Sequence, residues 1–378
     1  MIHPLTSRTV APRRPGLVAG LVLAGAIAAA AQTAAADPVI YRDIPFADHW
    51  SESFFICYMD LYLPADHGGP WPTVIWIHGG SWSGGNRRDA LADASVLIRL
   101  GYAVAAIEYR FSQVKPWPAQ IHDCKGAARW LRGHAQQYHL DSDRFIAWGQ
   151  SAGGHLAAVM ATSAGNAELE GTAAGYLEYS SSVQACVDFL GPSRLLALPE
   201  PDLACGTMSS NLIGRCLVDI IAHHDDPAWA PWLHACNTAD PTGHITPATP
   251  PFLISHGLAD SMVDPQQSFI LRDALVAAGH SPEFYPIEGQ DHFVTPEQSA
   301  LGFDFIQRLF PPPEVPQGRM CPDCTLNGSV GLDDIAVILQ HWGRAVPRWT
   351  NGDVTGDGSI TINDLAIIVQ RWGEICFP

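Results

Sequence analysis

The chain has 378 residues, of which 47% are hydrophobic and 16% are charged, and its formal net charge at pH 7 is −17. This composition excludes a disordered chain, and the length suits one large α/β domain with a smaller appendage. Nucleic-acid binding requires a basic surface, so the acidic charge argues against a nucleic-acid partner.

Residues 1–36 are typical of an export signal. Three arginines precede an apolar run at residues 16–31, and an Ala-Ala-Ala sequence at 34–36 supplies the small residues that signal peptidase requires. The alternative is a membrane anchor, but the run is shorter than the roughly 20 residues that span a bilayer. We therefore expect cleavage after residue 36 and a secreted or extracytoplasmic protein with no membrane span.

Between residues 37 and 310, apolar runs rich in β-forming residues alternate with helical patterns. Strands that are apolar along nearly their whole length predict a mostly parallel sheet with helices on both faces. The segment 192–246, rich in Pro, Gly and His, interrupts this alternation and is expected to form a small cap. We expect strands at 54–64, 72–80, 102–108, 144–148, 183–191, 252–257 and 283–289, and helices at 89–100, 119–138 and 155–162.

One serine lies between two glycines in the sequence Gly149-Gln150-Ser151-Ala152-Gly153. The motif follows one predicted strand and precedes a predicted helix, which is the context of a nucleophile elbow. The glycines fit this interpretation because side chains at their positions would collide with the neighbouring strand and helix. The alternative is a loop of small residues that happens to contain a serine. The sequence favours Ser151 as a nucleophile, provided that its partners are present.

A serine nucleophile needs a base, a group that orients the base, and donors for the developing oxyanion. Asp260 and His292 follow predicted strands in the chain order Ser, Asp, His that this architecture uses. Asp264 is the alternative orienting carboxylate, although it lies closer to the start of the next helix. The backbone amides of Gly80, Ser81 and Ala152 are the predicted oxyanion donors.

Five segments give a resemblance to a known family. They are VIWIHGGSW, YAVAAIEYR, PAQIHDCKGAARWLR, GQSAGGHLAA and PPFLISHGLAD. Together they resemble an α/β-hydrolase of the feruloyl/acetyl-esterase-like branch, akin to the hormone-sensitive lipase group, over residues 41–310. The chain departs from that pattern in two respects. Ser81 replaces the third glycine of the HGGG version, and the cap is longer and contains cysteines.

The resemblance implies hydrolysis of carboxylic esters, often acetyl or feruloyl esters on polysaccharide, through a Ser-His-Asp triad and an acyl-enzyme. It implies no cofactor for catalysis. Serine peptidases, formamidases and short-chain lipases or arylesterases use the same fold and remain alternatives. An inactive binding module is a weaker alternative, because all three triad residues are present.

The nine cysteines all follow the export signal, where disulfides persist. Cys205, Cys216 and Cys236 lie in the predicted cap, and we expect one disulfide among them. Three others lie in apolar runs and are expected to be buried thiols. They are Cys57, Cys124 and Cys186.

A proline-rich linker at residues 311–319 separates this domain from an internal repeat within residues 320–378. The segments 323–343 and 353–373 superimpose at an offset of 30 residues. Each has oxygen-bearing side chains at loop positions 1, 3, 5 and 12 and a glycine at position 6, which is the pattern of a calcium loop. The predicted calcium ligands are Asp323, Thr325, Asn327 and Asp334 in the first loop, and Asp353, Thr355, Asp357 and Asp364 in the second.

Each predicted loop is followed by an apolar helical run that ends in Trp-Gly. The alternative interpretation is a pair of Asx-rich turns without metal. The doubled loop and helix resembles a type I dockerin, which implies a small all-α domain, two bound calcium ions and a cohesin partner. Anchoring to another surface protein remains an alternative.

Overall fold

The computed structural model describes residues 38–49, 55–64, 68–172, 174–313 and 332–341, together with the isolated positions 359–361, 365 and 368. The predicted export signal and most of the C-terminal repeat lie outside these residues. In the repeat, α12 (Leu332–His341) coincides with the predicted helical run after the first loop. No helix in the described part of the chain is long and apolar enough to cross a membrane.

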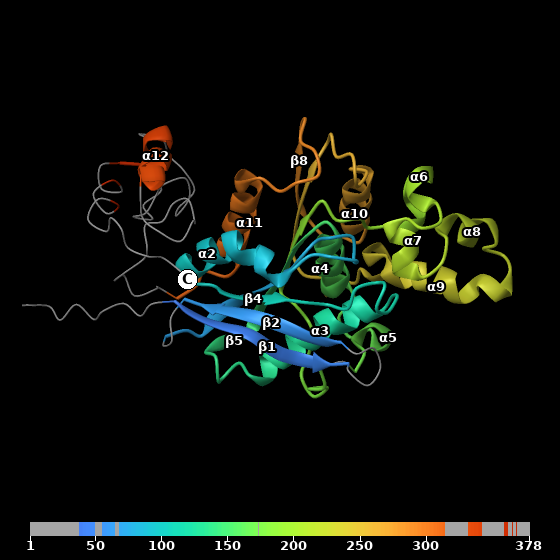
Figure 1. The fold of residues 1–378 in the computed structure, drawn as a ribbon, viewed down its shortest axis with the longest axis horizontal. Coiled ribbons are helices and arrows are strands. Elements are labelled where there is room, and N and C mark those ends of the chain that lie inside the picture. The colour runs from blue at the N-terminus through green and yellow to red at the C-terminus, as the bar shows by residue number, and fades with distance from the viewer. Residues whose placement is uncertain are drawn as a thin grey trace, which may run out of the picture. The chain divides into compact units, whose positions relative to one another are not determined.

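An eight-stranded sheet forms the centre of the domain in the order β1-β2-β4-β3-β5-β6-β7-β8 (Figure 1). The pairs β1–β2 and β2–β4 are antiparallel, whereas every pair from β4 to β8 is parallel. The strands are β1 (Val39–Asp48), β2 (Ile56–Leu63), β3 (Trp71–Ile77), β4 (Ala103–Ile107), β5 (Leu140–Gln150), β6 (Ala185–Phe189), β7 (Phe252–Gly257) and β8 (Glu283–Ile287). The predicted mostly parallel sheet is confirmed.

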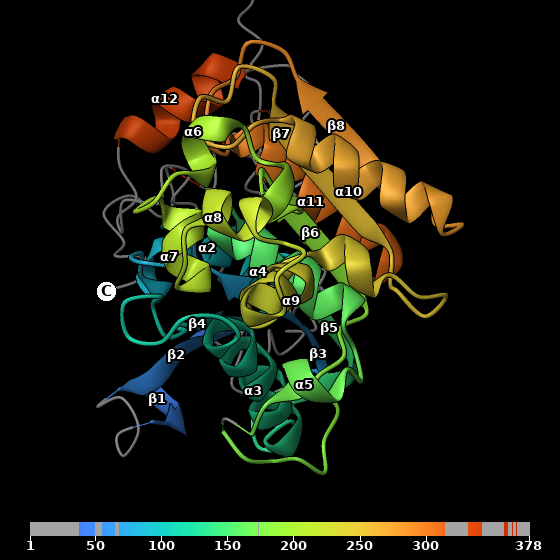
Figure 2. The ribbon, with the colours of Figure 1, turned by 90° about the vertical axis from the view of Figure 1, so that its right-hand side faces the viewer.

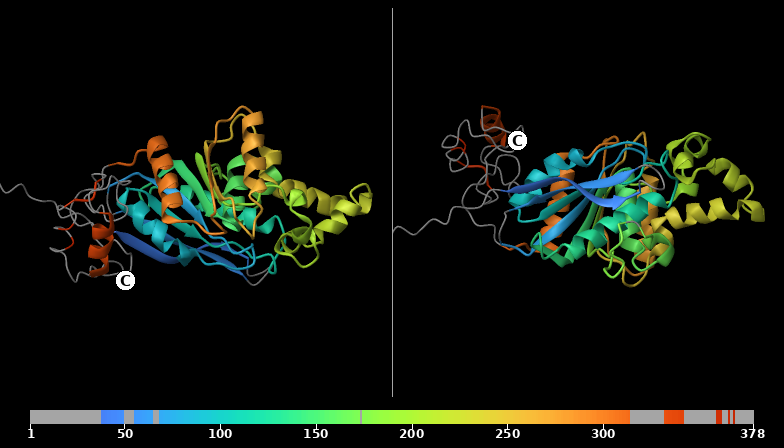
Figure 3. Two further views of the ribbon diagram at one scale, coloured as in Figure 1. Left: turned by 90° about the horizontal axis from the view of Figure 1, so that it is seen from above. Right: turned by 60° about the horizontal axis from the view of Figure 1, so that its bottom comes forward.

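Helices cover both faces of the sheet, as expected (Figures 2 and 3). Val74 and Trp76 of β3 belong to one core cluster, and Ile75 and Ile77 to the other. Because successive side chains of a strand point to opposite faces, both faces are buried and the strand is apolar throughout. The first cluster includes α2 (Leu91–Arg99) and α11 (Pro296–Leu309); the second includes α3 (Ala119–Gly133), α4 (Ala152–Thr162) and α10 (Gln266–Ala277).

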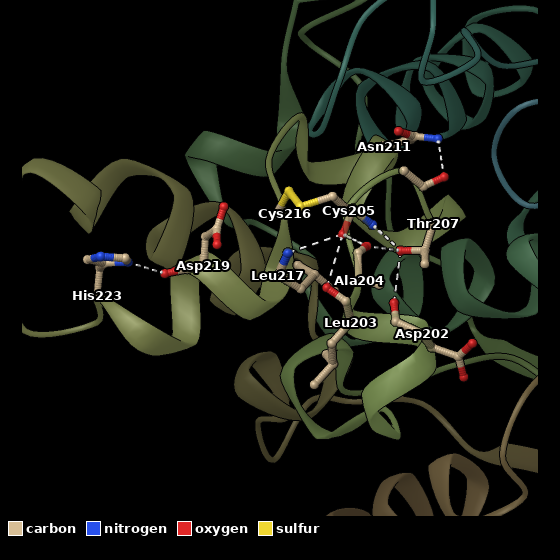
Figure 4. Close-up of a disulfide and its surroundings, with 12 residues drawn as sticks. Asp202, Leu203, Ala204, Cys205, Thr207, Asn211, Cys216, Leu217, Asp219 and His223 are labelled. Atoms are coloured by element: carbon tan, nitrogen blue, oxygen red, sulfur yellow. Dashed lines mark hydrogen bonds between the residues drawn. A yellow bond between two sulfur atoms is a disulfide. The ribbon is translucent and has the colours of Figure 1, made fainter.

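The segment predicted as a cap forms short helices at one end of the sheet (Figure 1). A disulfide between Cys205 and Cys216 joins the segments that lead into the second and third of them (Figure 4). Cys236 is instead a buried free thiol, as are the three cysteines predicted to be so. The cap helices are α6 (Glu200–Leu203), α7 (Met208–Ile213), α8 (Leu217–Ala222) and α9 (Ala230–Ala239), and α5 (Ala167–Glu170) precedes them in the chain.

Several predicted boundaries differ from the structure. The helix expected at 119–138 ends at Gly133. The expected end was too late because Trp130, His134 and Tyr138 keep the helical spacing through the turn that follows, where their rings pack together. The edge strand β1 was not predicted, since its exposed and buried residues follow no simple alternation. α4 begins three residues earlier than expected, directly after Ser151.

Candidate active site

Ser151 occupies the turn between β5 and α4 with φ 54° and ψ −123°. This left-handed backbone conformation is costly for a residue with a side chain and is held by its surroundings. The Ser151 amide donates to the Phe189 carbonyl at 2.8 Å, and the Ser151 carbonyl accepts from the His155 amide at 3.0 Å. The turn is therefore fixed to β6 on one side and to the first turn of α4 on the other.

The glycines around Ser151 allow this turn. A Cβ atom at Gly149 would lie 2.2 Å from the Gly153 carbonyl oxygen, and one at Gly153 would lie 2.0 Å from the Ile77 carbonyl oxygen. Both distances are far below van der Waals contact, and both clashes are with backbone, which cannot rotate away. The strand and helix therefore exclude side chains at these positions, as the sequence motif predicted.

Three predicted site residues meet at the carboxyl ends of the parallel strands. His292 Nε2 lies 3.0 Å from Ser151 Oγ, and His292 Nδ1 lies 2.7 Å from Asp260 Oδ2. With Nδ1–H donating to the carboxylate, Nε2 is the nitrogen that accepts the hydroxyl proton of Ser151. The arrangement can activate the Ser151 hydroxyl for nucleophilic attack.

The carboxylate of Asp260 is fully buried and accepts several hydrogen bonds. Its Oδ1 accepts from the amides of Met262 at 2.8 Å and Val263 at 2.9 Å, and its Oδ2 also accepts from His256 Nε2 at 3.0 Å. Burial alone would raise the pKa of Asp260, but the hydrogen bonds from His256, His292 and the two amides lower its pKa below the ordinary value. Asp260 is thus held as an anion beside His292.

The alternative carboxylate, Asp264, has another role in the structure. Its Oδ1 accepts from the Gln266 amide at 2.9 Å, at the start of α10. Within the described residues no hydrogen bond or ion pair joins Asp264 to His292. The geometry therefore favours Asp260, as the position just past β7 suggested.

Asp291 joins the two loops that carry Asp260 and His292. Its Oδ1 accepts from the Ser261 amide at 2.8 Å, from the Ser261 hydroxyl at 2.9 Å and from the His292 amide at 2.8 Å. These hydrogen bonds, with that from the Ser261 amide the strongest influence, lower the pKa of Asp291. The sequence motifs did not point to Asp291, although it lies directly before His292 in the chain.

The predicted oxyanion donors lie around the same turn. Gly80 and Ser81 follow β3 with positive φ values of 105° and 54°, and Ala152 is the first residue of α4. The loop passes close to the elbow, since a Cβ atom at Gly79 would be 3.0 Å from the Gln150 carbonyl oxygen. Among the described residues, no hydrogen bond uses the amides of Gly80, Ser81 or Ala152. They are available to a ligand oxygen.

Two further histidines support this site and were not predicted. His256 contacts Asp260, as given above, and His155 lies in the first turn of α4. Both side chains are fully buried. His256 belongs to β7 and His155 follows the elbow, but the sequence gives no sign of the partners they contact.

The side chains of the predicted calcium ligands lie outside the part of the chain that the structure describes. Asp334 belongs to α12, but the side chain is not among those described. The remaining seven predicted ligands lie outside the described residues: Asp323, Thr325, Asn327, Asp353, Thr355, Asp357 and Asp364.

Known proteins with similar sequences include esterases. The chain is 33% identical over 221 residues to LipM of Mycobacterium tuberculosis, described as a probable carboxylic ester hydrolase, and 29% identical over 293 residues to esterase LipQ of the same organism. The first comparison covers 58% of this chain and 48% of LipM, and the second covers 75% of this chain and 62% of LipQ. The chain thus spans about half to three fifths of the length of these relatives.

Solved structures with the same fold include carbohydrate esterases. A truncated form of a carbohydrate esterase from gut microbiota superimposes with a TM-score of 0.62 at 28% identity, covering 71% of this chain and 95% of that one. A bifunctional GH43-CE protein of Bacteroides eggerthii gives a TM-score of 0.63 at 29% identity, covering 71% of this chain and 38% of that one.

The family match covers most of the sheet and the elbow. The BD-FAE family model matches residues 59–275, which include Ser151 and Asp260 and end before His292. More than half of the chain lies within this match. The chain therefore belongs to the BD-FAE family of α/β-hydrolases.

Proposed function

We propose that the protein hydrolyses carboxylic esters with Ser151 as the nucleophile, His292 as the general base and Asp260 as the group that orients His292. The observation that carries this proposal is the continuous hydrogen-bond chain from Ser151 through His292 to Asp260 at a strained turn. The similarity to esterases, given above, supports the reaction class.

The proposed reaction has two halves. As Ser151 Oγ attacks the ester carbonyl carbon, its proton passes to His292 Nε2, and the carbonyl oxygen takes the negative charge beside the amides of Gly80, Ser81 and Ala152. The carbon–oxygen bond to the alcohol then breaks, and His292 returns the proton to the departing alcohol. Water attacks the resulting acyl-enzyme in the same way, which releases the acid and restores Ser151.

The test of this proposal is the variant Ser151→Ala with a short aryl acetate as substrate. We expect the variant to lose roughly three or more orders of magnitude in kcat. Ser163→Ala is the matched control, because among the described residues the Ser163 hydroxyl bonds only the Val159 carbonyl of α4, at 2.6 Å. A Ser151→Ala enzyme that keeps most of its activity would refute the assignment.

We further propose that the natural substrates are acetyl or feruloyl esters on polysaccharide. The resemblance of the five motifs and the carbohydrate esterases among the similar structures support this substrate class. Release of acetate and ferulate from acetylated and feruloylated xylan tests it. Cleavage of aryl esters without release from xylan would contradict the polysaccharide part and leave the reaction class standing.

We also propose that the enzyme is exported and attached to a partner through its C-terminal repeat. The export signal at 1–36 and the calcium-loop pattern after residue 320 support this proposal. A cohesin-type protein is the proposed partner, with calcium holding the repeat together.

A further inference from the structure

A cavity of about 840 Å³ lies between the cap and the loop that carries the proposed oxyanion donors. The Ser83 amide donates to the Gly80 carbonyl at 3.0 Å, so this part of the lining belongs to the same turn as the proposed oxyanion donors Gly80 and Ser81. Its polar lining includes Ser83, Ser112 and Gln113 from the loops after β3 and β4, and Asn211, Arg215 and Asp219 from the cap.

The guanidinium of Arg215 is oriented by stacking on two indole rings. Its Cζ lies 4.5 Å from the ring centroid of Trp229 and 4.9 Å from that of Trp232. Stacking on aromatic faces fixes the guanidinium plane and leaves the N–H groups at its edge. Within the described residues, no acceptor pairs with these N–H groups. Arg215 is thus a fixed set of donors on the wall of the cavity.

Asp219 supplies acceptors on the same wall. Its backbone carbonyl accepts from His223 Nδ1 at 2.8 Å (Figure 4), but its carboxylate has no hydrogen-bond or ion-pair partner among the described residues. Asp219 lies four residues after Arg215, yet no ion pair joins the two side chains among the described residues. The disulfide between Cys205 and Cys216 holds this segment of the cap in place (Figure 4).

Two amide side chains add further polar groups to the lining of the cavity. Gln113 Nε2 donates to the Ser83 carbonyl at 2.8 Å, and Asn211 Nδ2 donates to the Gly206 carbonyl at 3.3 Å. Each amide is therefore positioned by one hydrogen bond, and its side-chain oxygen has no protein donor among the described residues. Hydroxyl and amide groups thus line the cavity together with a guanidinium and a carboxylate.

This combination of groups selects the ligand class. An apolar acyl chain would strip water from the unpaired Arg215 and Asp219 without replacing their hydrogen bonds. The Asp219 carboxylate would repel an anionic ligand, and the Arg215 guanidinium would repel a cationic one. A neutral group with many hydroxyls can both accept from Arg215 and donate to Asp219.

We infer that this cavity binds neutral sugar units of the alcohol part of the ester, with Arg215 and Asp219 as its principal hydrogen-bonding side chains. The inference rests on the proposed function, because the sugar is the part of the substrate that leaves Ser151. It adds to that function a site on the cap for the sugar, distinct from the residues that act on the ester bond.

The first experiment measures binding without the reaction. Neutral tetrasaccharides of xylose, arabinose, glucose and mannose are titrated by calorimetry into the full chain carrying Ser151→Ala. At least one is expected to bind, and Arg215→Gln and Asp219→Ala are each expected to weaken it by about ten-fold or more. Asp225→Ala is the matched control, since this cap carboxylate is 93% exposed and lies outside the cavity lining.

Absence of binding by all four sugars, or binding by both variants within about two-fold of the parent, would overturn the inference. The melting temperature of each variant is measured alongside. If Arg215→Gln proves unfolded, Asp219→Ala decides the matter, because its carboxylate makes no contact that folding depends on.

The second experiment compares two substrates on the enzyme with Ser151 intact. The ratio of kcat/KM for an acetylated xylo-oligosaccharide to that for an aryl acetate is expected to fall by about ten-fold in both variants, through KM. An unchanged ratio would overturn the sugar site. A wild-type enzyme that cleaves neither ester would instead contradict the proposed function, and the titration would still decide the sugar site.

Discussion

Trp82 donates its indole N–H to His155 Nδ1 over 3.2 Å, and this hydrogen bond joins the loop of the proposed oxyanion donors to the helix that follows Ser151. His155 Nε2 lies 2.7 Å from the Ala239 carbonyl oxygen, at the end of cap helix α9. Because Nδ1 accepts, Nε2 carries the proton and donates. One neutral imidazole thus connects the elbow, the oxyanion loop and the cap.

We predict that His155→Ala lowers kcat by about 10- to 100-fold for any ester, with a smaller change in KM. Ser81 and Trp82 both have φ 54°, and the buried Trp82 indole holds this strained loop against the core. Without its acceptor the loop can shift, and the oxyanion amides lose their alignment. Steady-state kinetics on the folded variant measures the effect.

His155→Asn serves as the conservative comparison, because an amide can still accept from Trp82 and donate to Ala239. It should recover part of the lost kcat. If both variants remain folded and keep the wild-type kcat, His155 has only a packing role.

A second prediction concerns the pH dependence of stability. Burial lowers the pKa of His155 to about 4, although the hydrogen bond to Ala239 opposes this. An unfolded histidine takes up its proton near pH 6.5, so between pH 6.5 and about 4 the unfolded chain binds more protons at this residue. The contribution of neutral His155 to stability is complete above pH 6.5 and is lost as the pH falls through that window.

We therefore expect the free energy of unfolding of the wild type to fall, relative to that of His155→Asn, by roughly 2 to 3 kcal/mol between pH 7 and pH 4.5. Urea unfolding of both proteins at the two pH values measures the difference. Other buried groups titrate alike in the two proteins, so the comparison isolates His155. Parallel pH dependences would show that folding leaves the pKa of His155 at its ordinary value.

A third prediction concerns His256. The Ser268 hydroxyl lies 2.6 Å from His256 Nδ1 and donates to it, which leaves Nε2–H to donate to the Asp260 oxygen that His292 also contacts. We predict that His256→Leu moves the acid limb of the kcat/KM pH profile upward by about 0.5 to 1 unit. With one donor fewer, Asp260 attracts the protonated imidazole of His292 more strongly.

The control for His256 is Asp264→Asn, which removes a nearby charge that makes no contact with His292. Its acid limb should coincide with that of the wild type. A His256→Leu profile that falls in height without moving along the pH axis would leave His256 with a packing role alone.

A fourth prediction concerns calcium and depends on the sequence alone. Removing calcium with a chelator should reduce the helical circular-dichroism signal of the C-terminal repeat and leave ester hydrolysis unchanged. Asp353→Ala, which removes the first ligand of the second loop, should have part of the same effect. Calcium added back should restore the signal of the wild type, and a spectrum insensitive to chelator would contradict the calcium loops.

The triad and the elbow could be predicted because their signals are local. Gly149 and Gly153 bracket Ser151 in one short motif, and Asp260 and His292 each follow a strand that the apolar pattern indicates. A side chain that directly follows a strand of a parallel sheet lies at the edge where the carboxyl ends of the strands meet. Its position can therefore be predicted once the strand is identified.

Other features depend on contacts between distant residues. His155 contacts Trp82 and Ala239, which lie 73 and 84 residues away along the chain. The pairing of Cys205 with Cys216, in preference to Cys236, required the positions of the cap helices. Neither the contacts of His155 nor the cysteine pairing produces a periodic pattern or a characteristic spacing in the sequence, so neither could be predicted from it.

The turn at Ser151 has no space for larger side chains at the glycines that surround it. A methyl group at Gly149, Gly153 or Gly154 would overlap a backbone carbonyl or the Asp188 carboxylate. The cap, by contrast, includes exposed side chains on its surface, such as Val218 and Ile221. Descendants of this chain can therefore acquire new substrates by substitution within 192–246 while inheriting the nucleophile turn unaltered, and the same division tells an engineer where a library of variants belongs.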